Sequence, residues 1–171
     1  LCDMVSDIVD QRAFDGTTGK KLVITSEWVE LLDLVKSSIE HIGADITCLD
    51  GRMSISARKA SLKAFRQGTS NVMLMTLGVG GVGLDIPEAE VIIVLAPWWN
   101  PKRIDQAIAR LTRDDRHESI TAYILVMKDS LEEGVLEIGE RKRAMIQTVL
   151  EGGDADETGA LLMVDMAHVA G

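Results

Sequence analysis

Just after residue 100 the sequence carries three polar side chains with helical spacing. Gln106, Arg110 and Arg113 stand four and three residues apart, which puts them on one face of a helix. A second set with the same spacing is apolar and lies roughly opposite: Ile104, Ile108 and Leu111. The apolar face can dock on a sheet while the amide and both guanidinium groups point into a cleft. Guanidinium groups held in this way can stabilise charge on a transferred phosphoryl group, although a solvated basic face would show the same pattern.

A glycine-rich loop lies upstream of this helix, between two apolar runs at residues 72–75 and 91–95. Four of the six residues from 78 to 83 are glycine: Gly78, Gly80, Gly81 and Gly83. A loop with so few Cβ atoms lets a phosphate or a nucleic-acid backbone approach its amides closely. The loop therefore indicates a phosphate-contacting surface.

The elements that must position these groups alternate along the chain. Apolar runs predict five strands, at residues 22–25, 46–49, 72–75, 91–95 and 121–126. Apolar residues at helical spacing predict helices at about 1–14, 26–42, 56–67, after Pro101, and 130–150. Strands that alternate with helices favour an α/β fold, a mostly parallel sheet with helices on both faces.

Local signals mark the ends of two of these helices. Ser26 and Ser130 are residue types that suit the N-cap, and Gly43 is placed to end the helix that Ser26 begins. Trp28 falls on the apolar stripe of that helix, so we expect it to pack in the core rather than face solvent.

The segment Gly16-Thr17-Thr18-Gly19-Lys20 is not a phosphate loop. Such a loop follows a strand, has four residues between its glycines, and carries Ser or Thr after the lysine. This segment precedes a strand and meets none of those conditions, so we interpret it as an ordinary loop.

Charge is distributed unevenly along the chain. The formal net charge is −9, which by itself argues against a simple nucleic-acid binder. Residues 51–116, however, hold 10 basic and 6 acidic side chains, whereas residues 1–50 hold 4 and 10, and residues 117–171 hold 4 and 11. Positive charge is concentrated where the motifs are. The helix near 56–67 carries four cations and no acid: Arg58, Lys59, Lys63 and Arg66.

Length and composition indicate one domain within an intracellular protein. The chain has 171 residues, of which 46% are hydrophobic, enough for a normal core. No apolar run approaches the ~20 residues that span a bilayer, and no signal-peptide pattern is present. Cys2 and Cys48 form neither a metal-ligand spacing nor a disulfide framework. The chain starts at Leu1 rather than methionine, so we expect it to be a piece of a longer protein.

In order, the glycine-rich loop, Trp98-Trp99-Asn100-Pro101 and Gln106-Ala-x-x-Arg110-x-x-Arg113 resemble the second, C-terminal RecA-like lobe of SWI/SNF-type ATPases in helicase superfamily two. The resemblance covers roughly residues 20 to 150. It implies a RecA-like three-layer sandwich over 1–150, a phosphate-loop NTPase fold without the phosphate loop. Residues 151–171 are then an acidic linker and a short apolar helix near 161–169.

The resemblance also implies roles for individual residues. Arg110 and Arg113, with Gln106, would face the γ-phosphate of ATP. A first lobe in the same protein would bind most of the ATP and its Mg²⁺. Gly81, Gly83 and Asp85 would lie near the nucleotide, although Asp85 could equally stabilise the turn before Pro87. Double-stranded DNA would be contacted by residues of the other motifs: Ser26, Gly51, Arg52, Lys59, Lys63, Gly80, Trp98 and Asn100.

These roles imply a DNA translocase for chromatin remodelling or DNA repair, with nucleosomes or DNA-bound protein as further partners. We expect no membrane partner, and in a eukaryote we expect the protein in the nucleus. Three departures keep two alternatives open. Asp114-Asp115-Arg116 follows where a Gly-Gln pair is usual, Ala96 replaces an aspartate, and Val79 replaces an alanine. A lobe that has lost turnover and serves as an interaction module is one alternative. A strand-separating DNA or RNA helicase lobe is the other, which the Trp-Trp-Asn-Pro motif disfavours.

Overall fold

A computed structural model describes residues 1–10, 20–68, 70–79, 86, 88–97, 100–109, 111, 120–150 and 168–169. Its strands are β1 (Leu22–Ser26), β2 (Ile46–Leu49), β3 (Val72–Thr76), β4 (Val91–Leu95), β5 (Thr121–Met127) and the two-residue β6 (His168–Val169). Its helices are α1 (Cys2–Asp10), α3 (Val29–Ile39), the 3-10 turn η1 (Glu40–Ile42), α4 (Ile55–Arg66), α5 (Pro101–Ala109) and α6 (Leu131–Leu150). All five strands predicted from the apolar runs are confirmed.

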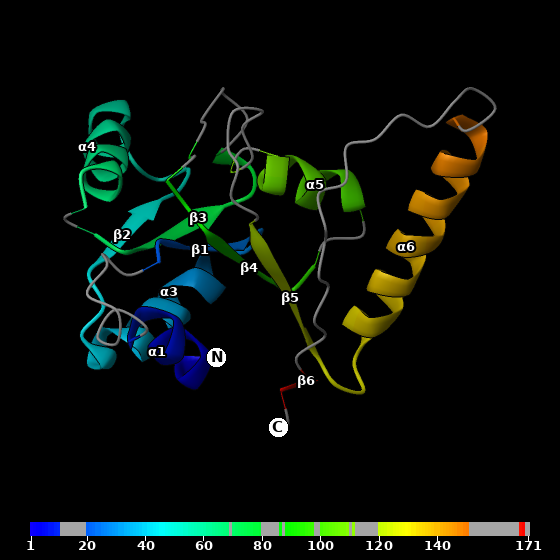
Figure 1. The fold of residues 1–171 in the computed structure, drawn as a ribbon, viewed down its shortest axis with the longest axis horizontal. Coiled ribbons are helices and arrows are strands. Elements are labelled where there is room, and N and C mark those ends of the chain that lie inside the picture. The colour runs from blue at the N-terminus through cyan, green and yellow to red at the C-terminus, as the bar shows by residue number, and fades with distance from the viewer. Residues whose placement is uncertain are drawn as a thin grey trace.

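The strands form one parallel sheet in the order β2-β3-β1-β4-β5-β6. Every neighbouring pair is parallel, which requires crossover connections, and helices lie in the connections from β1 to β2, β2 to β3, β4 to β5 and β5 to β6. Helices α4 and α5 lie over one face and helices α1 and α3 over the other (Figure 1). Helix α6 follows β5 and stands beside α5. The predicted three-layer α/β sandwich is confirmed.

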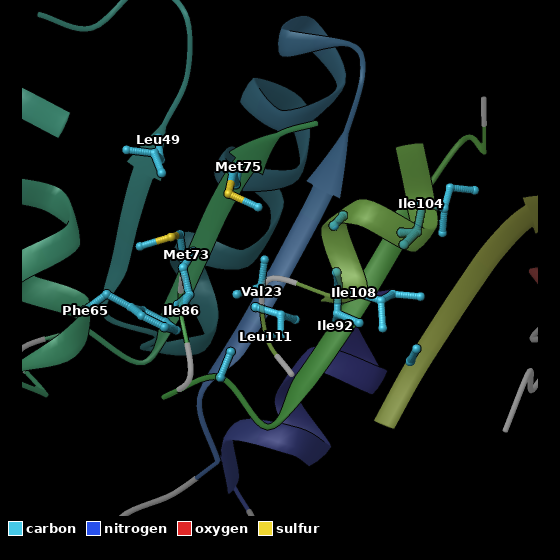
Figure 2. Packing of buried hydrophobic residues seen from close by; sticks show 14 of the residues in the cluster. Val23, Leu49, Phe65, Met73, Met75, Ile86, Ile92, Ile104, Ile108 and Leu111 are labelled. Atoms are coloured by element: carbon cyan, nitrogen blue, oxygen red, sulfur yellow. The ribbon is translucent and has the colours of Figure 1, made fainter. Parts of the chain in front are cut away.

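Two apolar clusters hold the layers together. Alternate residues of each strand point to opposite faces, so one strand feeds both clusters. Val23 of β1 joins Phe65 of α4 and Ile104 of α5 on one face (Figure 2). Its neighbours Leu22 and Ile24 join residues of α1 and α3 on the other face. The central strands β1, β3 and β4 are thus buried on both sides, which explains why they are continuous apolar runs rather than alternating ones.

The docking face predicted for the helix after Pro101 is confirmed. Ile104 is 2% exposed, Ile108 8% and Leu111 0%. Gln106, two positions further round the helix than Ile104, is exposed.

The start of α3 differs from the prediction. Ser26 ends β1 instead of capping the helix; Trp28 occupies the N-cap position, with no side-chain cap hydrogen bond. The Oγ of Ser26 accepts a hydrogen bond from the Trp28 N–H (3.1 Å), forming a local turn before the helix begins. That turn moves Trp28 off the apolar stripe. The tryptophan is 53% exposed, so the prediction that it packs in the core was wrong.

Other predicted helix ends are confirmed. Gly43 closes the turn after α3 with a φ of 71°, a left-handed conformation that glycine adopts at little cost. The Ser130 Oγ accepts from the Glu132 N–H (3.1 Å) at the start of α6. Ile138 of α6 is 51% exposed, so this apolar side chain of the helix does not pack in the core. Of the helix expected near 161–169, only His168 and Val169 are described, and they form β6.

Candidate nucleic-acid interface

Several of the predicted site residues lie at one edge of the sheet, where the parallel strands end. Ser26, the last residue of β1, pairs with Thr76, the last of β3, and its carbonyl accepts from the Leu77 N–H (3.1 Å). Leu49 at the end of β2 pairs with Met75. The turns after β1, β2 and β3 therefore share the carboxyl edge, which is where ligands bind in open α/β sheets.

The end of β1 is buried. Thr25 and Ser26 are both 0% exposed, and the Ser26 hydroxyl accepts from the Trp28 N–H. A contact between Ser26 and a DNA phosphate would need this turn to rearrange, so the geometry does not favour the role that the sequence predicted.

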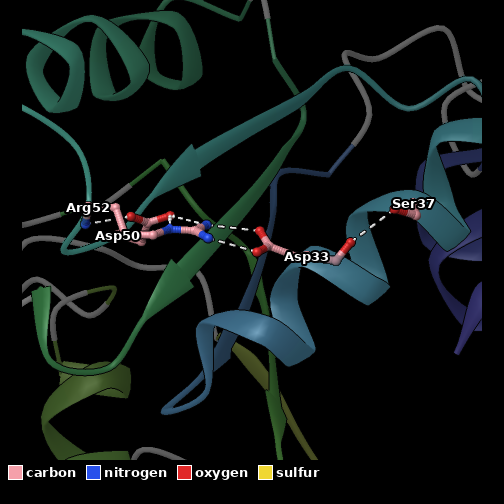
Figure 3. A network of polar contacts seen from close by, with 4 residues as sticks. All are labelled: Asp33, Ser37, Asp50 and Arg52. Atoms are coloured by element: carbon pink, nitrogen blue, oxygen red, sulfur yellow. Dashed lines mark hydrogen bonds and ion pairs between the residues drawn. The ribbon is translucent and has the colours of Figure 1, made fainter.

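The turn after β2 is built around Arg52 (Figure 3). Its guanidinium donates to both oxygens of Asp33 on α3, Nη1 to Oδ2 (2.7 Å) and Nη2 to Oδ1 (2.9 Å). The Nη2 and Nε atoms also donate to Asp50 Oδ2 (2.9 and 3.3 Å), and the Arg52 N–H donates to Asp50 Oδ1 (2.8 Å). One arginine therefore joins the end of β2 to the neighbouring helix.

The electrostatics of this cluster follow from those contacts. Hydrogen bonds from Arg52 hold the pKa values of Asp33 and Asp50 below their usual range, because a donated hydrogen bond favours the ionised carboxylate. The same two acids raise the pKa of Arg52. Two carboxylates against one guanidinium leave the cluster with a net charge of −1. Arg52 thus has two acidic partners within the protein, and its contact with DNA stays a prediction.

The start of α4 is well defined. The Ser54 Oγ accepts from the Ala57 N–H (3.2 Å) and caps the helix. Arg58 donates from Nη2 to the Gly51 carbonyl (3.1 Å), which ties the turn to the helix from the other side. Gly51 itself is exposed, and a Cβ built on it would meet no atom within 4 Å. The backbone at Gly51 is therefore open to a ligand.

Lys59 and Lys63 are the cations of α4 that stay available. Both side chains are exposed, and they stand four residues apart on one face. Neither forms an ion pair with any residue in the described part of the chain. Arg66, by contrast, lies 3.5 Å from Glu88 through its Nε.

The start of α5 lies at the same edge. The Asn100 Oδ1 accepts from the Lys102 N–H (3.2 Å), so Asn100 caps the first turn. Arg103 of α5 pairs with Glu27, which follows β1. Gln106 is exposed one turn later. Neither Arg103 and Glu27 nor Asp33 was a predicted site residue, because each has its partner far away along the chain.

The remaining predicted site residues lie outside the described residues. They are Gly80, Gly81, Gly83, Asp85, Trp98, Arg110 and Arg113. Their roles stay predictions.

An all-parallel sheet between two helical layers, with its turns gathered at the carboxyl edge, is a RecA-like α/β fold. Comparison with known proteins agrees. The family described as helicase conserved C-terminal domain matches residues 2–115. The C-terminal part of the Fun30 ATPase domain shares the fold, with a TM-score of 0.71 over 80% of this chain and 43% of that chain, at 20% identity.

The chain belongs to the helicase conserved C-terminal domain family, and its relatives are of SWI/SNF type. It is 36% identical over 146 residues to the helicase-like transcription factor CHR27 of Arabidopsis thaliana, covering 85% of this chain. It is 34% identical over 150 residues to the DNA repair protein RAD5 of Saccharomyces cerevisiae, covering 84% of this chain. It spans only 14% and 12% of the length of those two proteins. In the described residues no helix is both long and apolar enough to cross a membrane.

Proposed function

We propose that this chain is the second lobe of an ATP-dependent double-stranded DNA translocase that serves chromatin remodelling or DNA repair. The observation that carries the proposal is the carboxyl edge of the sheet. The open turn at Gly51 and the capped start of α5 at Asn100 lie along it, and α4, which begins there, carries the exposed Lys59 and Lys63. Relatives described as a transcription factor and a DNA repair protein support the class of activity.

DNA would be held through its phosphates rather than its bases. Lysines and open backbone are groups that contact phosphates without reading sequence, which suits a motor that must move along any DNA. Gly80 and Trp98 would extend this surface, as their motifs predict. Such a motor in a eukaryotic cell would work in the nucleus.

ATP would be the substrate, shared with a first lobe of the same protein. The sequence contains no phosphate loop, so the first lobe would hold the triphosphate and Mg²⁺. This lobe would supply Arg110 and Arg113 toward the γ-phosphate, with Gln106 beside them and Gly81, Gly83 and Asp85 near the rest of the nucleotide. The exposed position of Gln106 and the buried opposite face of α5 support this arrangement.

Turnover in the two-lobed protein tests the proposal. Arg110→Ala and Arg113→Ala should each lower kcat for DNA-stimulated ATP hydrolysis by about 10³, while nucleotide affinity changes little, because a positioned arginine acts mainly on the transition state. Arg141→Ala is the matched control: Arg141 is exposed on α6 and pairs only with Glu137 among the described residues. Near-normal turnover in both arginine variants would refute the proposed role.

The isolated chain gives a second test. It should bind duplex DNA weakly, with a Kd in or above the micromolar range of non-specific contacts. It should not hydrolyse ATP, because it carries no phosphate loop. Magnesium-dependent hydrolysis by the purified chain would contradict the two-lobe division of labour. A two-lobed protein that binds DNA but never hydrolyses ATP would instead identify an interaction module.

A further inference from the structure

Arg52 donates four of its five guanidinium N–H groups to carboxylates within the protein. Four hydrogen bonds of 2.7 to 3.3 Å run from its guanidinium to Asp33 and Asp50, and the pair with Asp33 is bidentate. Fork-to-fork pairs between arginine and carboxylate are among the strongest and most directional side-chain contacts. A phosphate could reach only the remaining Nη1 N–H without displacing carboxylates that already bind the guanidinium.

The two acids differ in how much they depend on Arg52. The Asp50 side chain is 8% exposed, whereas that of Asp33 is 53% exposed. A nearly buried carboxylate that loses its partner is costly, since water cannot replace the lost contact. Asp50 also organises the turn, because its Oδ1 accepts from the Arg52 N–H and its carbonyl accepts from the Met53 N–H (3.3 Å). Arg52 therefore stabilises the acid on which the turn before α4 is built.

The cluster also sets the charge beside the open backbone at Gly51. Without Arg52, two carboxylates would stand next to the surface that is proposed to meet phosphates. Carboxylates placed at a surface that meets phosphates would repel them, because like charges across an interface cost free energy. The arginine thus has two effects at this edge: it fixes the turn, and it neutralises one of two acids.

We propose that Arg52 is a positioning residue that locks the turn between β2 and α4 onto α3 and shields DNA from Asp33 and Asp50, and is not itself a phosphate ligand. The inference rests on the proposed DNA-binding function. In this proposal Arg52 makes no direct DNA contact, unlike the role that the sequence predicted for it. Asp33 of α3 then affects DNA binding indirectly, by holding Arg52.

Salt-dependent binding of a short duplex to the 171-residue chain, followed by fluorescence anisotropy, separates the two roles. Arg52→Ala should weaken binding. Adding Asp33→Asn and Asp50→Asn should restore the wild-type affinity or better, because the acids that repel DNA are gone while asparagine keeps an oxygen for the turn. The slope of log affinity against log salt should return to the wild-type value.

The control is Lys59→Ala alone, which leaves both carboxylates on Arg52. It takes the formal net charge from −9 to −10, because one cation is removed. Only the control should lose about 0.9 from the slope, the loss expected for one phosphate contact. An equal loss in the Arg52 triple variant would show that Arg52 binds a phosphate, and would overturn the inference while leaving the proposed function intact. A wild-type chain that binds no duplex at low salt would overturn the proposed function.

Amide hydrogen exchange without DNA tests the turn itself. Arg52→Ala should speed exchange at residues 51–54, and Arg52→Lys should restore protection only in part, because lysine cannot make the forked pair. Lys59→Ala should leave those amides unchanged. Unchanged exchange in Arg52→Ala would overturn the locking role, whatever the DNA measurements show.

Discussion

Reversing both exposed lysines of α4 is the sharpest test of where DNA lies. Lys59 and Lys63 share one face of the helix and are unpaired among the described residues, so both are placed to neutralise phosphates. Binding to duplex DNA releases counterions, and each phosphate neutralised adds about 0.9 to the slope of log affinity against log salt. Lys59→Glu with Lys63→Glu should therefore reduce that slope by about 1.8.

The size of the effect can be stated as a change in affinity. Between about 50 and about 200 mM salt the concentration rises fourfold, and a slope difference of about 1.8 then corresponds to about a tenfold difference in how far affinity falls. The wild-type chain should lose about ten times more affinity over that interval than the double variant. Fluorescence anisotropy with a short labelled duplex at four or more salt concentrations measures both slopes.

The control must change the same charge elsewhere. Lys20→Glu with Lys36→Glu also takes the formal net charge from −9 to −13, since each reversal subtracts two charges. Lys20 precedes β1 and so lies at the amino edge of the sheet, and Lys36 lies on α3, which covers the opposite face. This control should weaken binding uniformly and keep the wild-type slope. Equal slopes in the α4 variant and the wild type would mean that the DNA track does not cross α4.

Three further predictions concern stability, measured as the free energy of unfolding in urea. Ala96 has a φ of 49°, a left-handed conformation that alanine tolerates poorly, so Ala96→Gly should stabilise the chain by about 0.5–1 kcal/mol. As a control, Ala60→Gly in the middle of α4 should destabilise it by about 1 kcal/mol. A loss of stability in Ala96→Gly would contradict this reasoning. Phe65→Ala should cost about 3–5 kcal/mol, because Phe65 is 0% exposed between α4 and the sheet, and a loss under 1 kcal/mol would refute that packing. Folding lowers the pKa of Asp50, so its ionised form stabilises the chain above pH ~4, and that contribution is lost as pH falls through the folded pKa. The stability difference between wild type and Asp50→Asn should then shrink below pH ~4; a constant difference would show that the carboxylate is not held by Arg52.

The sequence was a good guide to the elements because their signals are local. A run such as Val91–Leu95 is apolar throughout, since a strand of a parallel sheet is covered on both faces. The docking face of α5 was equally readable, because residues at helical spacing must share a face. Such signals need no knowledge of the rest of the chain.

Local signals failed where a neighbouring turn changed the geometry. The Ser26 hydroxyl has two uses, capping a helix or bonding the N–H two residues on, and both are common for serine. In this chain it bonds the Trp28 N–H, so the helix begins three residues after Ser26 and Trp28 turns outward. The prediction counted Trp28 as part of the helix, and so placed it on the apolar stripe, whereas the helix begins at Val29.

Charge counted along the chain misled for a different reason. The basic excess of residues 51–116 suggested many cations for DNA, but charge acts through space and its partners need not be near in sequence. Arg52 is held by Asp33, 19 residues away, and Arg103 by Glu27, 76 residues away. Acids from outside the segment thus occupy arginines inside it. On α4, Lys59 and Lys63 are the cations that remain available for phosphates. These lysines, rather than the more numerous arginines of residues 51–116, should therefore set the salt dependence of DNA binding.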